Sequence, residues 1–192
     1  MVVTLPDETC DLRLEQRVGD DLECPLTLDA AAHPEPPRPT PAAEPLRPPV
    51  SDEPDAVERS VEYFAEGGLY CSEAILRAFN EVYELGLPTA AYAMATPFGA
   101  GMGAAKCSCG AVTGGQMVLG LVHGRTSAAT SEGPAFEAAK ELHDRFRARY
   151  KVICCRGLTR KLPWGEPEHH RVCQEYVRFA AGEVADLLRT SP

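Results

Sequence analysis

Apolar side chains recur at helical spacing through most of the chain after residue 55, and this pattern constrains the fold more than any other feature of the sequence. Two such stripes are Ile75, Ala78, Val82, Leu85 and Phe136, Ala139, Phe146, Tyr150. Steps of three and four residues place side chains on one face of an α-helix. No segment alternates apolar and polar residues as a half-buried strand would. The sequence therefore predicts an all-α fold, a compact bundle of about five to six helices.

Capping residues, glycines and prolines divide this region into elements. Helices are expected over residues 52–67, 71–86, 109–122, 135–150 and 169–188, with a short helix after Pro88. Asp52 or Ser51 is the expected cap of the first helix. A glycine-rich loop, Pro97–Gly103, precedes the helix that starts near Cys109, and residues 151–167 are expected to be irregular.

The first 54 residues differ from the rest in composition. They carry 12 acidic and 4 basic side chains, and residues 34–54 contain nine prolines. Proline-rich segments favour extended conformations and act as spacers. We therefore expect residues 1–54 to be an acidic, Pro-rich, disordered tail or linker, and residues 55–192 to be the helical Cys-rich redox domain. The tail is also a candidate docking segment for a partner.

Charge and hydropathy exclude several classes of protein. Residues 55–192 carry 16 acidic and 15 basic side chains, so no basic surface for nucleic acid is expected. No apolar run reaches the roughly 20 residues of a membrane-spanning helix. The N-terminus lacks the basic and apolar regions of a secretory signal, which predicts a cytoplasmic protein. A homodimer is left open.

The cysteines are the main candidates for chemistry. There are eight, Cys10, Cys24, Cys71, Cys107, Cys109, Cys154, Cys155 and Cys173. Without a secretory signal, such a count favours metal binding or redox chemistry over structural disulfides. Cys71, Cys109 and Cys173 share helix faces with apolar residues, so their thiols should point between the helices. Ordinary core cysteines are the alternative, because cysteine is among the most buried residue types.

Helix starts and glycines add to this interpretation. Cys71 and Cys109 begin helices, where free N–H groups stabilise a thiolate. Gly110 and Gly114 leave the surface beside Cys109 bare, so that a cofactor or another helix can approach. Gly101 lies in a Gly-x-Gly-x-Gly loop that could cradle a phosphate or a flavin. His169 and His170 are expected on the solvated surface, and Trp164 is expected to cover the core.

Several spaced motifs together resemble a known family. They are Cys71-Ser-Glu-Ala-Ile-Leu, Phe98-Gly-Ala-Gly-Met-Gly, Cys109-Gly-Ala-Val-Thr-Gly-Gly, Val118-Leu-Gly-Leu, Cys155-Arg-Gly-Leu and Cys173. Their order resembles the redox-active protein family labelled by its C…GCAxxG…C…C pattern. It is also similar to the C-terminal module of split-Soret cytochromes, where four cysteines hold a two-iron, two-sulfur cluster. The resemblance covers residues 56–188 and implies a site at Cys71, Cys109, Cys155 and Cys173.

Three functions fit these observations. The leading hypothesis is a redox protein whose four cysteines bind an iron–sulfur cluster of the [2Fe–2S] type and pass electrons to an unidentified redox partner protein. A metal-free thiol–disulfide protein would need no cofactor, only two cysteines close enough to bridge. A structural zinc or interaction module, docked through the acidic tail, would use the same thiols. Cys107 or Cys154 could replace a neighbouring ligand, and either a carrier or an oxidoreductase is compatible with the sequence.

Overall fold

The computed structural model describes residues 55–66 and 68–190. The expected tail, residues 1–54, lies outside the described residues, and its boundary with the helical domain stays a prediction. Within the described ranges there are seven α-helices, two short 3₁₀ helices and no strand, which confirms the all-α class. The α-helices are α1 (Ala56–Ala65), α2 (Cys71–Val82), α3 (Gly99–Met102), α4 (Gly110–His123), α5 (Gly133–Tyr150), α6 (Cys155–Thr159) and α7 (Pro167–Thr190).

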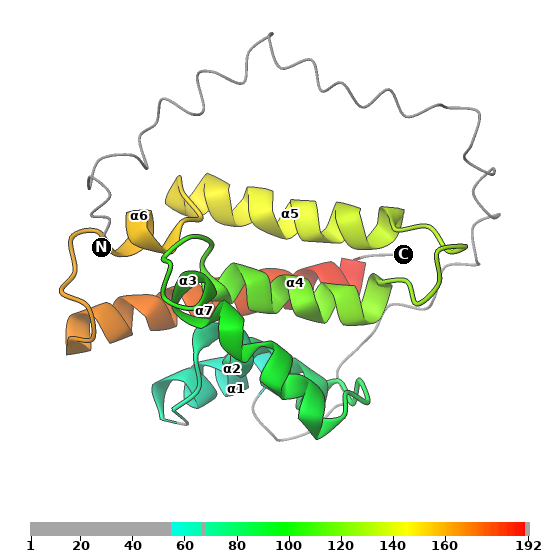
Figure 1. Ribbon diagram of the computed structural model, residues 1–192, viewed down its shortest axis with the longest axis horizontal. Helices are drawn as coiled ribbons and strands as arrows, with labels where there is room; N and C mark the ends of the chain where they lie inside the picture. Colours follow the sequence, from blue (N-terminus) through cyan, green and yellow to red (C-terminus); the bar gives the residue numbers. More distant parts are fainter. Residues whose placement is uncertain (1–54, 67, 191–192) are drawn as a thin grey trace, which may run out of the picture. The chain divides into compact units, whose positions relative to one another are not determined.

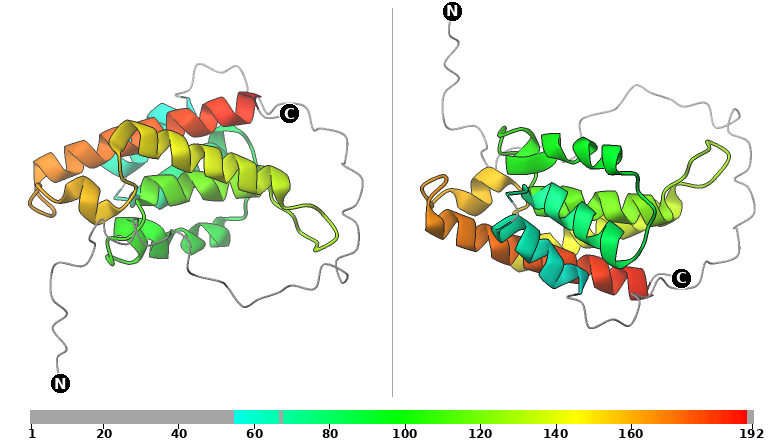
Figure 2. Two further views of the ribbon diagram at one scale, coloured as in Figure 1. Left: turned by 90° about the horizontal axis from the view of Figure 1, so that it is seen from above. Right: turned by 90° about the horizontal axis from the view of Figure 1, so that it is seen from below.

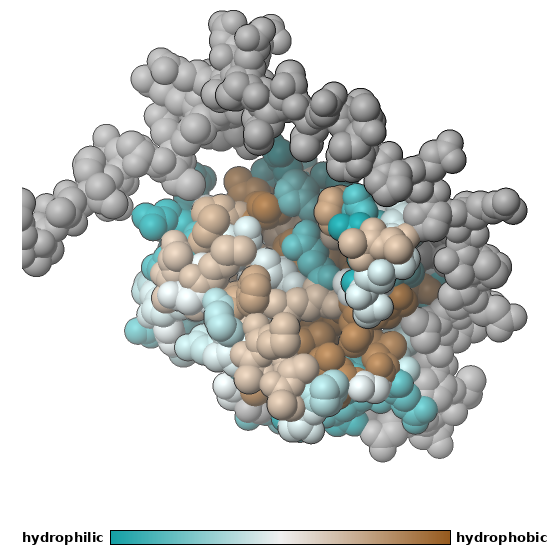
Figure 3. All heavy atoms as spheres, turned by 45° about the vertical axis from the view of Figure 1, so that its right-hand side comes forward, coloured by the Kyte–Doolittle hydropathy of each residue, from teal (hydrophilic) through white to brown (hydrophobic). Residues whose placement is uncertain are grey.

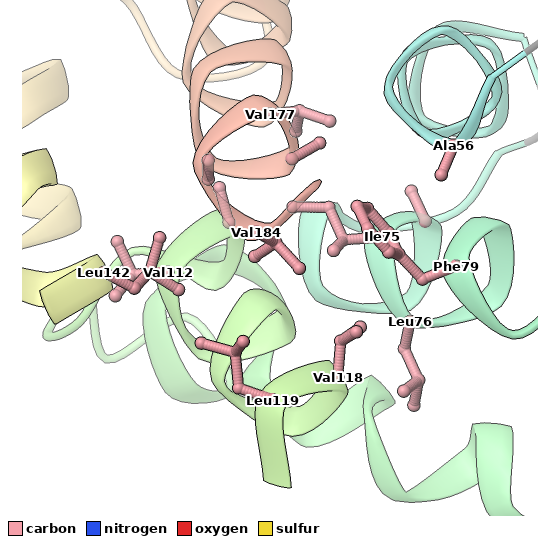
Figure 4. Close-up of a cluster of buried hydrophobic side chains, with 14 of the residues drawn as sticks. Ala56, Ile75, Leu76, Phe79, Val112, Val118, Leu119, Leu142, Val177 and Val184 are labelled. Atoms are coloured by element: carbon pink, nitrogen blue, oxygen red, sulfur yellow. The ribbon is translucent and has the colours of Figure 1, made fainter. Parts of the chain in front are cut away.

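Helix α4 lies in the middle of these elements. It packs against α2, α5 and α7, while α1 packs against α2 and α7 (Figures 1 and 2). Side chains from all five helices meet in one hydrophobic core (Figure 4). Its fully buried members include Ile75, Phe79, Val112, Val118, Leu119, Leu142, Val177 and Val184. The stripe of α2 faces this core as predicted. In α5 the prediction holds only in part, because Phe146 is buried but Phe136 is 69% exposed, and the fully buried Leu142 lies outside the predicted stripe.

Two glycines let α4 occupy this central position. A Cβ added at Gly114 would lie 2.8 Å from the Cα of Ser72 on α2. At Gly115 it would lie 2.7 Å from Leu142 of α5 and 2.8 Å from Val184 of α7. These separations are shorter than van der Waals contact. A Cβ at Gly114 would push the backbone of α2 away, and a Cβ at Gly115 would force the methyl groups of the buried Leu142 and Val184 to move. Close helix packing therefore explains the need for glycine at both positions.

The elements differ from expectation in several places. The cap of α1 is Asp55, whose carboxylate accepts hydrogen bonds from the N–H groups of Val57 and Glu58, and not Asp52 or Ser51. Helix α2 ends at Val82, and the short helix after Pro88 is a 3₁₀ helix, Thr89–Met94. The stretch expected to be irregular contains the five-residue helix α6. A second 3₁₀ helix, Thr96–Phe98, precedes the glycine-rich turn.

The surface of the described residues mixes apolar and polar side chains. Hydrophobic side chains gather between hydrophilic ones on the face shown in Figure 3. Across the described residues, Met94 and Phe136 are the most exposed of the large apolar side chains, each at 69%. Single exposed apolar residues are ordinary on proteins, so we assign no partner from them. None of the described helices has the length and apolarity needed to cross a bilayer.

Candidate functional site

Four cysteines from four separate segments line one cavity of about 330 Å³. Cys71 is the first residue of α2, Cys109 caps α4, Cys155 is the first residue of α6, and Cys173 lies inside α7. We call this space the cysteine cavity. The remaining large side chains in its wall are Phe64, Leu69, Tyr70, Leu158, Trp164, His169, His170 and Tyr176. The structure thus brings together all four residues that the sequence singled out.

Backbone pairing between two loops places Cys109 beside Cys155. Ser108 and Cys154 form an isolated antiparallel bridge. The Cys109 N–H donates to the Ile153 carbonyl at 2.8 Å, and the Cys155 N–H donates to the Cys107 carbonyl at 2.6 Å. These bonds hold the start of α4 against the start of α6, although 46 positions separate the two cysteines in the sequence.

The two extra thiols beside this pair do not line the cysteine cavity. Cys107 is exposed to solvent. Cys154 is half-buried, and its thiol donates to the Lys106 carbonyl at 3.1 Å. The arrangement therefore presents Cys109 and Cys155 to the cavity and turns their neighbours elsewhere. Which thiols act as ligands stays a prediction.

The three glycines expected to contact a cofactor occupy different surroundings. Gly110 lines the cavity, and a Cβ there would lie 2.3 Å from the sulfur of Cys71. At Gly101 a Cβ would lie 2.7 Å from the Cβ of Cys155, and its φ of +71° suits glycine. Gly114 contacts the backbone of α2, as described above, and like Gly101 it is absent from the cavity lining. Contact of Gly101 or Gly114 with a cofactor stays a prediction.

The glycine-rich turn follows an unusual backbone path next to Cys71. Five consecutive residues have positive φ, namely Ala100, Gly101, Met102, Gly103 and Ala104. Left-handed backbone is unfavourable for residues with a Cβ, so this turn stores strain that the surrounding contacts must offset. One of those contacts is the hydrogen bond from the Cys107 N–H to the Gly101 carbonyl at 3.1 Å. Ala100 itself lines the cysteine cavity.

Burial controls the ionisation of the four thiols. It raises the pKa of Cys71 to about 11, with a further increase from Cys155, whereas the N–H groups of Ala100 and Ser72 act in the opposite direction. Burial and the neighbouring Cys71 raise the pKa of Cys173 to about 12. Burial also raises the pKa of Cys109 and Cys155. In the reduced, metal-free protein these thiols are neutral near pH 7, so burial outweighs the thiolate stabilisation expected at the helix starts.

Sequence reasoning missed the histidines in the wall of this cavity. His169 is buried, and its Nε2 lies 3.8 Å from the sulfur of Cys173. The prediction that it is solvated surface was wrong. Its ring packs on Trp164, with ring centres 4.4 Å apart, and burial lowers its pKa. The spacing of His169 and Cys173, four residues apart on one helix, was the available signal.

His170 was also placed on the surface by the sequence, and it is half-buried. Its ring stacks on Phe64 of α1, with ring centres 4.6 Å apart and an angle of 14° between the planes. Trp164, which was expected to cover the core, is 46% exposed and lines the cavity. The cysteine cavity is therefore a thiol cluster with an aromatic and imidazole wall.

Comparison with known families identifies the segment that carries this site. The sequence profile described as "Putative redox-active protein (C_GCAxxG_C_C)" matches residues 69–187, which contain α2 to α6, most of α7 and all four cavity cysteines. Comparison with curated proteins and with solved structures gives no significant match. Since the profile covers more than half of the chain, the protein belongs to the redox-active family defined by the C_GCAxxG_C_C cysteine pattern.

Proposed function

We propose that this protein transfers electrons through a [2Fe–2S] cluster held by Cys71, Cys109, Cys155 and Cys173. The observation that carries the proposal is the meeting of these four side chains, from four separate segments, in the wall of one cavity. Four cysteine thiolates are the usual ligands of a two-iron cluster, which supplies a one-electron couple when bound. Membership of a redox-active family supports the same conclusion.

The chemistry of the surroundings suits such a group. The residues described around the cavity include no Asp, Glu, Lys or Arg, so thiolates are the only anionic ligands that its wall offers. Backbone N–H groups of Ser72 and Ala100 face Cys71, and that of Ala111 faces Cys109. Hydrogen bonds of this kind stabilise cysteine sulfurs bound to iron and adjust the cluster's potential.

The number of ligands around each iron is also relevant. In the described ranges, no three Cys, His, Asp or Glu side chains are placed so that they could hold a single metal ion. A two-iron cluster shares its four cysteines between two irons, two at each, and so does not require three ligands at one point. The proposed cluster therefore does not depend on a group of three ligands around one ion.

Cluster binding must release protons, because iron binds the thiolate form of cysteine. Burial holds the pKa of all four thiols above the ordinary value. The affinity for iron should therefore increase as the pH rises through the neutral range. The N–H groups facing Cys71 and Cys109 reduce the cost of forming those two thiolates.

A metal-free dithiol is the second candidate, and the central place of Cys71 favours it. Interaction with Cys71 raises the pKa of Cys109 and of Cys173, and interaction with Cys155 raises that of Cys71. Cys71 thus lies near each of the other three. Oxidation of two such thiols would form one disulfide and give two electrons and two protons to an oxidant.

Metal analysis of the full chain distinguishes these functions. The protein is purified without oxygen and assayed for iron, acid-labile sulfide and zinc, and its visible absorption is recorded before and after reduction. We expect iron and sulfide in the ratio of the [2Fe–2S] formula, with an absorption band that weakens on reduction. Zinc alone would indicate a structural site. A reversible change in titratable thiols without metal would indicate the dithiol.

Two serine variants test which thiols are involved. Cys109→Ser removes a buried cavity thiol, whereas Cys107→Ser removes an exposed thiol two residues earlier. Cys109→Ser should lose iron and the visible band, and Cys107→Ser should keep both. Equal loss in the two variants, or wild-type protein with no metal and no reducible disulfide, would overturn the proposal.

A further inference from the structure

The cysteine cavity is large enough for a small organic molecule, and among the described residues no charged side chain lines it. Its volume of about 330 Å³ lies within the range of small-molecule sites, which begins at about 300 Å³. A dry cavity of about 150 Å³ already holds benzene. Apart from the cysteines, the wall consists of aromatic, imidazole, aliphatic and hydroxyl side chains. A ligand of one or two rings would fit, and none of the described side chains that line the cavity is an Asp, Glu, Lys or Arg.

Flat rings are already arranged in this wall. His170 stacks on Phe64, and His169 packs on Trp164. Trp164 also has the Lys106 ammonium 4.6 Å from its ring centre, which holds the indole from a second element. Tyr70 and Trp164 are about half exposed, whereas Phe64 and His169 are buried, so aromatic rings line both the rim and the interior. Such surfaces favour planar ligands through stacking.

The polar side chains of the cavity wall favour a ligand that accepts hydrogen bonds. The Tyr176 hydroxyl already donates to the Leu158 carbonyl, and the Thr159 hydroxyl donates to the Cys155 carbonyl. His169 and His170 each use one ring nitrogen in a contact within α7. Among the described residues, the second nitrogen of each ring has no partner. A neutral imidazole can therefore donate one hydrogen bond to a carbonyl oxygen of a ligand.

We infer that the cysteine cavity binds an uncharged quinone of one or two rings, stacked on its aromatic wall and hydrogen-bonded to a histidine. A quinone is planar, accepts hydrogen bonds through its carbonyl oxygens and exchanges electrons, which suits a site next to redox-active thiols. The choice of a redox-active ligand rests on the proposed function. The binding itself depends on the aromatic wall and does not require a bound cluster.

Fluorescence of Trp164 provides the test, because it is the only tryptophan of the chain. Duroquinone is titrated into the full chain, as purified and again after removal of iron. Its four methyl groups prevent thiols from adding to the ring. We expect quenching that saturates, in contrast to the linear quenching of free tryptophan amide. Quenching of the protein that stays linear would overturn the inference even if iron and sulfide are found.

Three variants and one ligand serve as controls. Tyr70→Ala removes an aromatic ring of the cavity rim, and Phe136→Ala removes an exposed ring that does not line the cavity. We expect Tyr70→Ala to weaken binding about three- to tenfold, the usual effect of one aromatic contact, and Phe136→Ala to leave it unchanged. A sulfonated benzoquinone should bind more weakly than duroquinone to a Lys106→Met variant, which lacks the ammonium group that contacts Trp164. Equal binding of the two quinones to this variant would also overturn the inference, whether or not Tyr70→Ala folds.

Discussion

Replacing Gly110 by alanine should displace the Cys71 sulfur while leaving the fold largely intact. The new Cβ would lie 2.3 Å from that sulfur and 3.1 Å from the Phe98 carbonyl oxygen. The sulfur sits at the end of a side chain with one rotatable bond, so it can move away by leaving its rotamer, at about 0.5–1.5 kcal/mol. We therefore expect a modest loss in the free energy of unfolding and a site without one of its four thiols.

Two other glycines of α4 provide reference variants for the stability of Gly110→Ala. At Gly114 the added Cβ would meet the backbone of Ser72, which cannot rotate away, so α2 and α4 must separate. Overpacking of this kind costs about 1–3 kcal/mol. At Gly120 nothing lies within 4 Å of the added Cβ, so the helix gains about 0.5–1 kcal/mol from alanine. Gly114 and Gly120 both lie inside α4, so replacing either by alanine raises helix propensity by a similar amount. The difference in the free energy of unfolding between the two variants therefore measures the cost of the contact with the Ser72 backbone.

Chemical unfolding of the reduced, metal-free variants gives these free energies. Reconstitution with iron, or the reaction rate of Cys71 with a thiol reagent, reports on the site. Gly110→Ala should be more stable than Gly114→Ala, take up less iron than the wild type and expose Cys71 to the reagent. The reasoning from these contacts would be wrong if Gly114→Ala matched Gly120→Ala in stability, or if Gly110→Ala left iron uptake and Cys71 reactivity unchanged.

Asp55→Ala should lower the free energy of unfolding by about 1 kcal/mol, because the carboxylate caps α1; Asp55→Asn, which keeps an acceptor, is the control. Leu142→Ala should lower the free energy of unfolding by about 2–5 kcal/mol, measured by the same chemical unfolding, because the side chain is fully buried. The reduced, metal-free protein should lose stability as the pH rises above about 9, where thiols of the unfolded chain ionise. Burial holds the pKa of Cys71 at about 11 and that of Cys173 at about 12, so the folded state keeps protons that the unfolded state releases. Replacing both cysteines by alanine should flatten this decline between about pH 9 and 11.

The helical architecture was predictable because each long helix has its own apolar stripe. The stripe of α2 gives its buried face without any knowledge of the partner, whereas the stripe of α5 included the exposed Phe136 and missed the buried Leu142. Boundaries were harder, since Ser51, Asp52 and Asp55 are all residues that cap helices, and burial of Ala56 at the start of α1 is a tertiary contact. Helix α6 spans only Cys155–Thr159, too short for a periodic pattern.

The site was also predictable only in part, because some of its residues are placed by contacts between segments that are far apart in the sequence. Cys71, Cys109 and Cys173 lie on apolar stripes, so their inward direction follows from the sequence. The choice of Cys155 over Cys154 depends on hydrogen bonds between two loops, which no local pattern specifies. His169 follows Glu166 and Glu168 at the start of a helix. This polar sequence predicts a solvated surface, although the His169 ring is buried.

The positions of the sulfurs follow from contacts that do not involve the thiols of the other cysteines. Gly110 leaves room for Cys71, backbone hydrogen bonds join the segments of Cys109 and Cys155, and the packing of α7 carries Cys173 to the same cavity. Removing one thiol therefore leaves the contacts that place the other three. Loss of a bound group and loss of the fold should then be separable in single cysteine variants. That separation is what allows iron content, thiol titration and quinone binding to be interpreted as properties of the site.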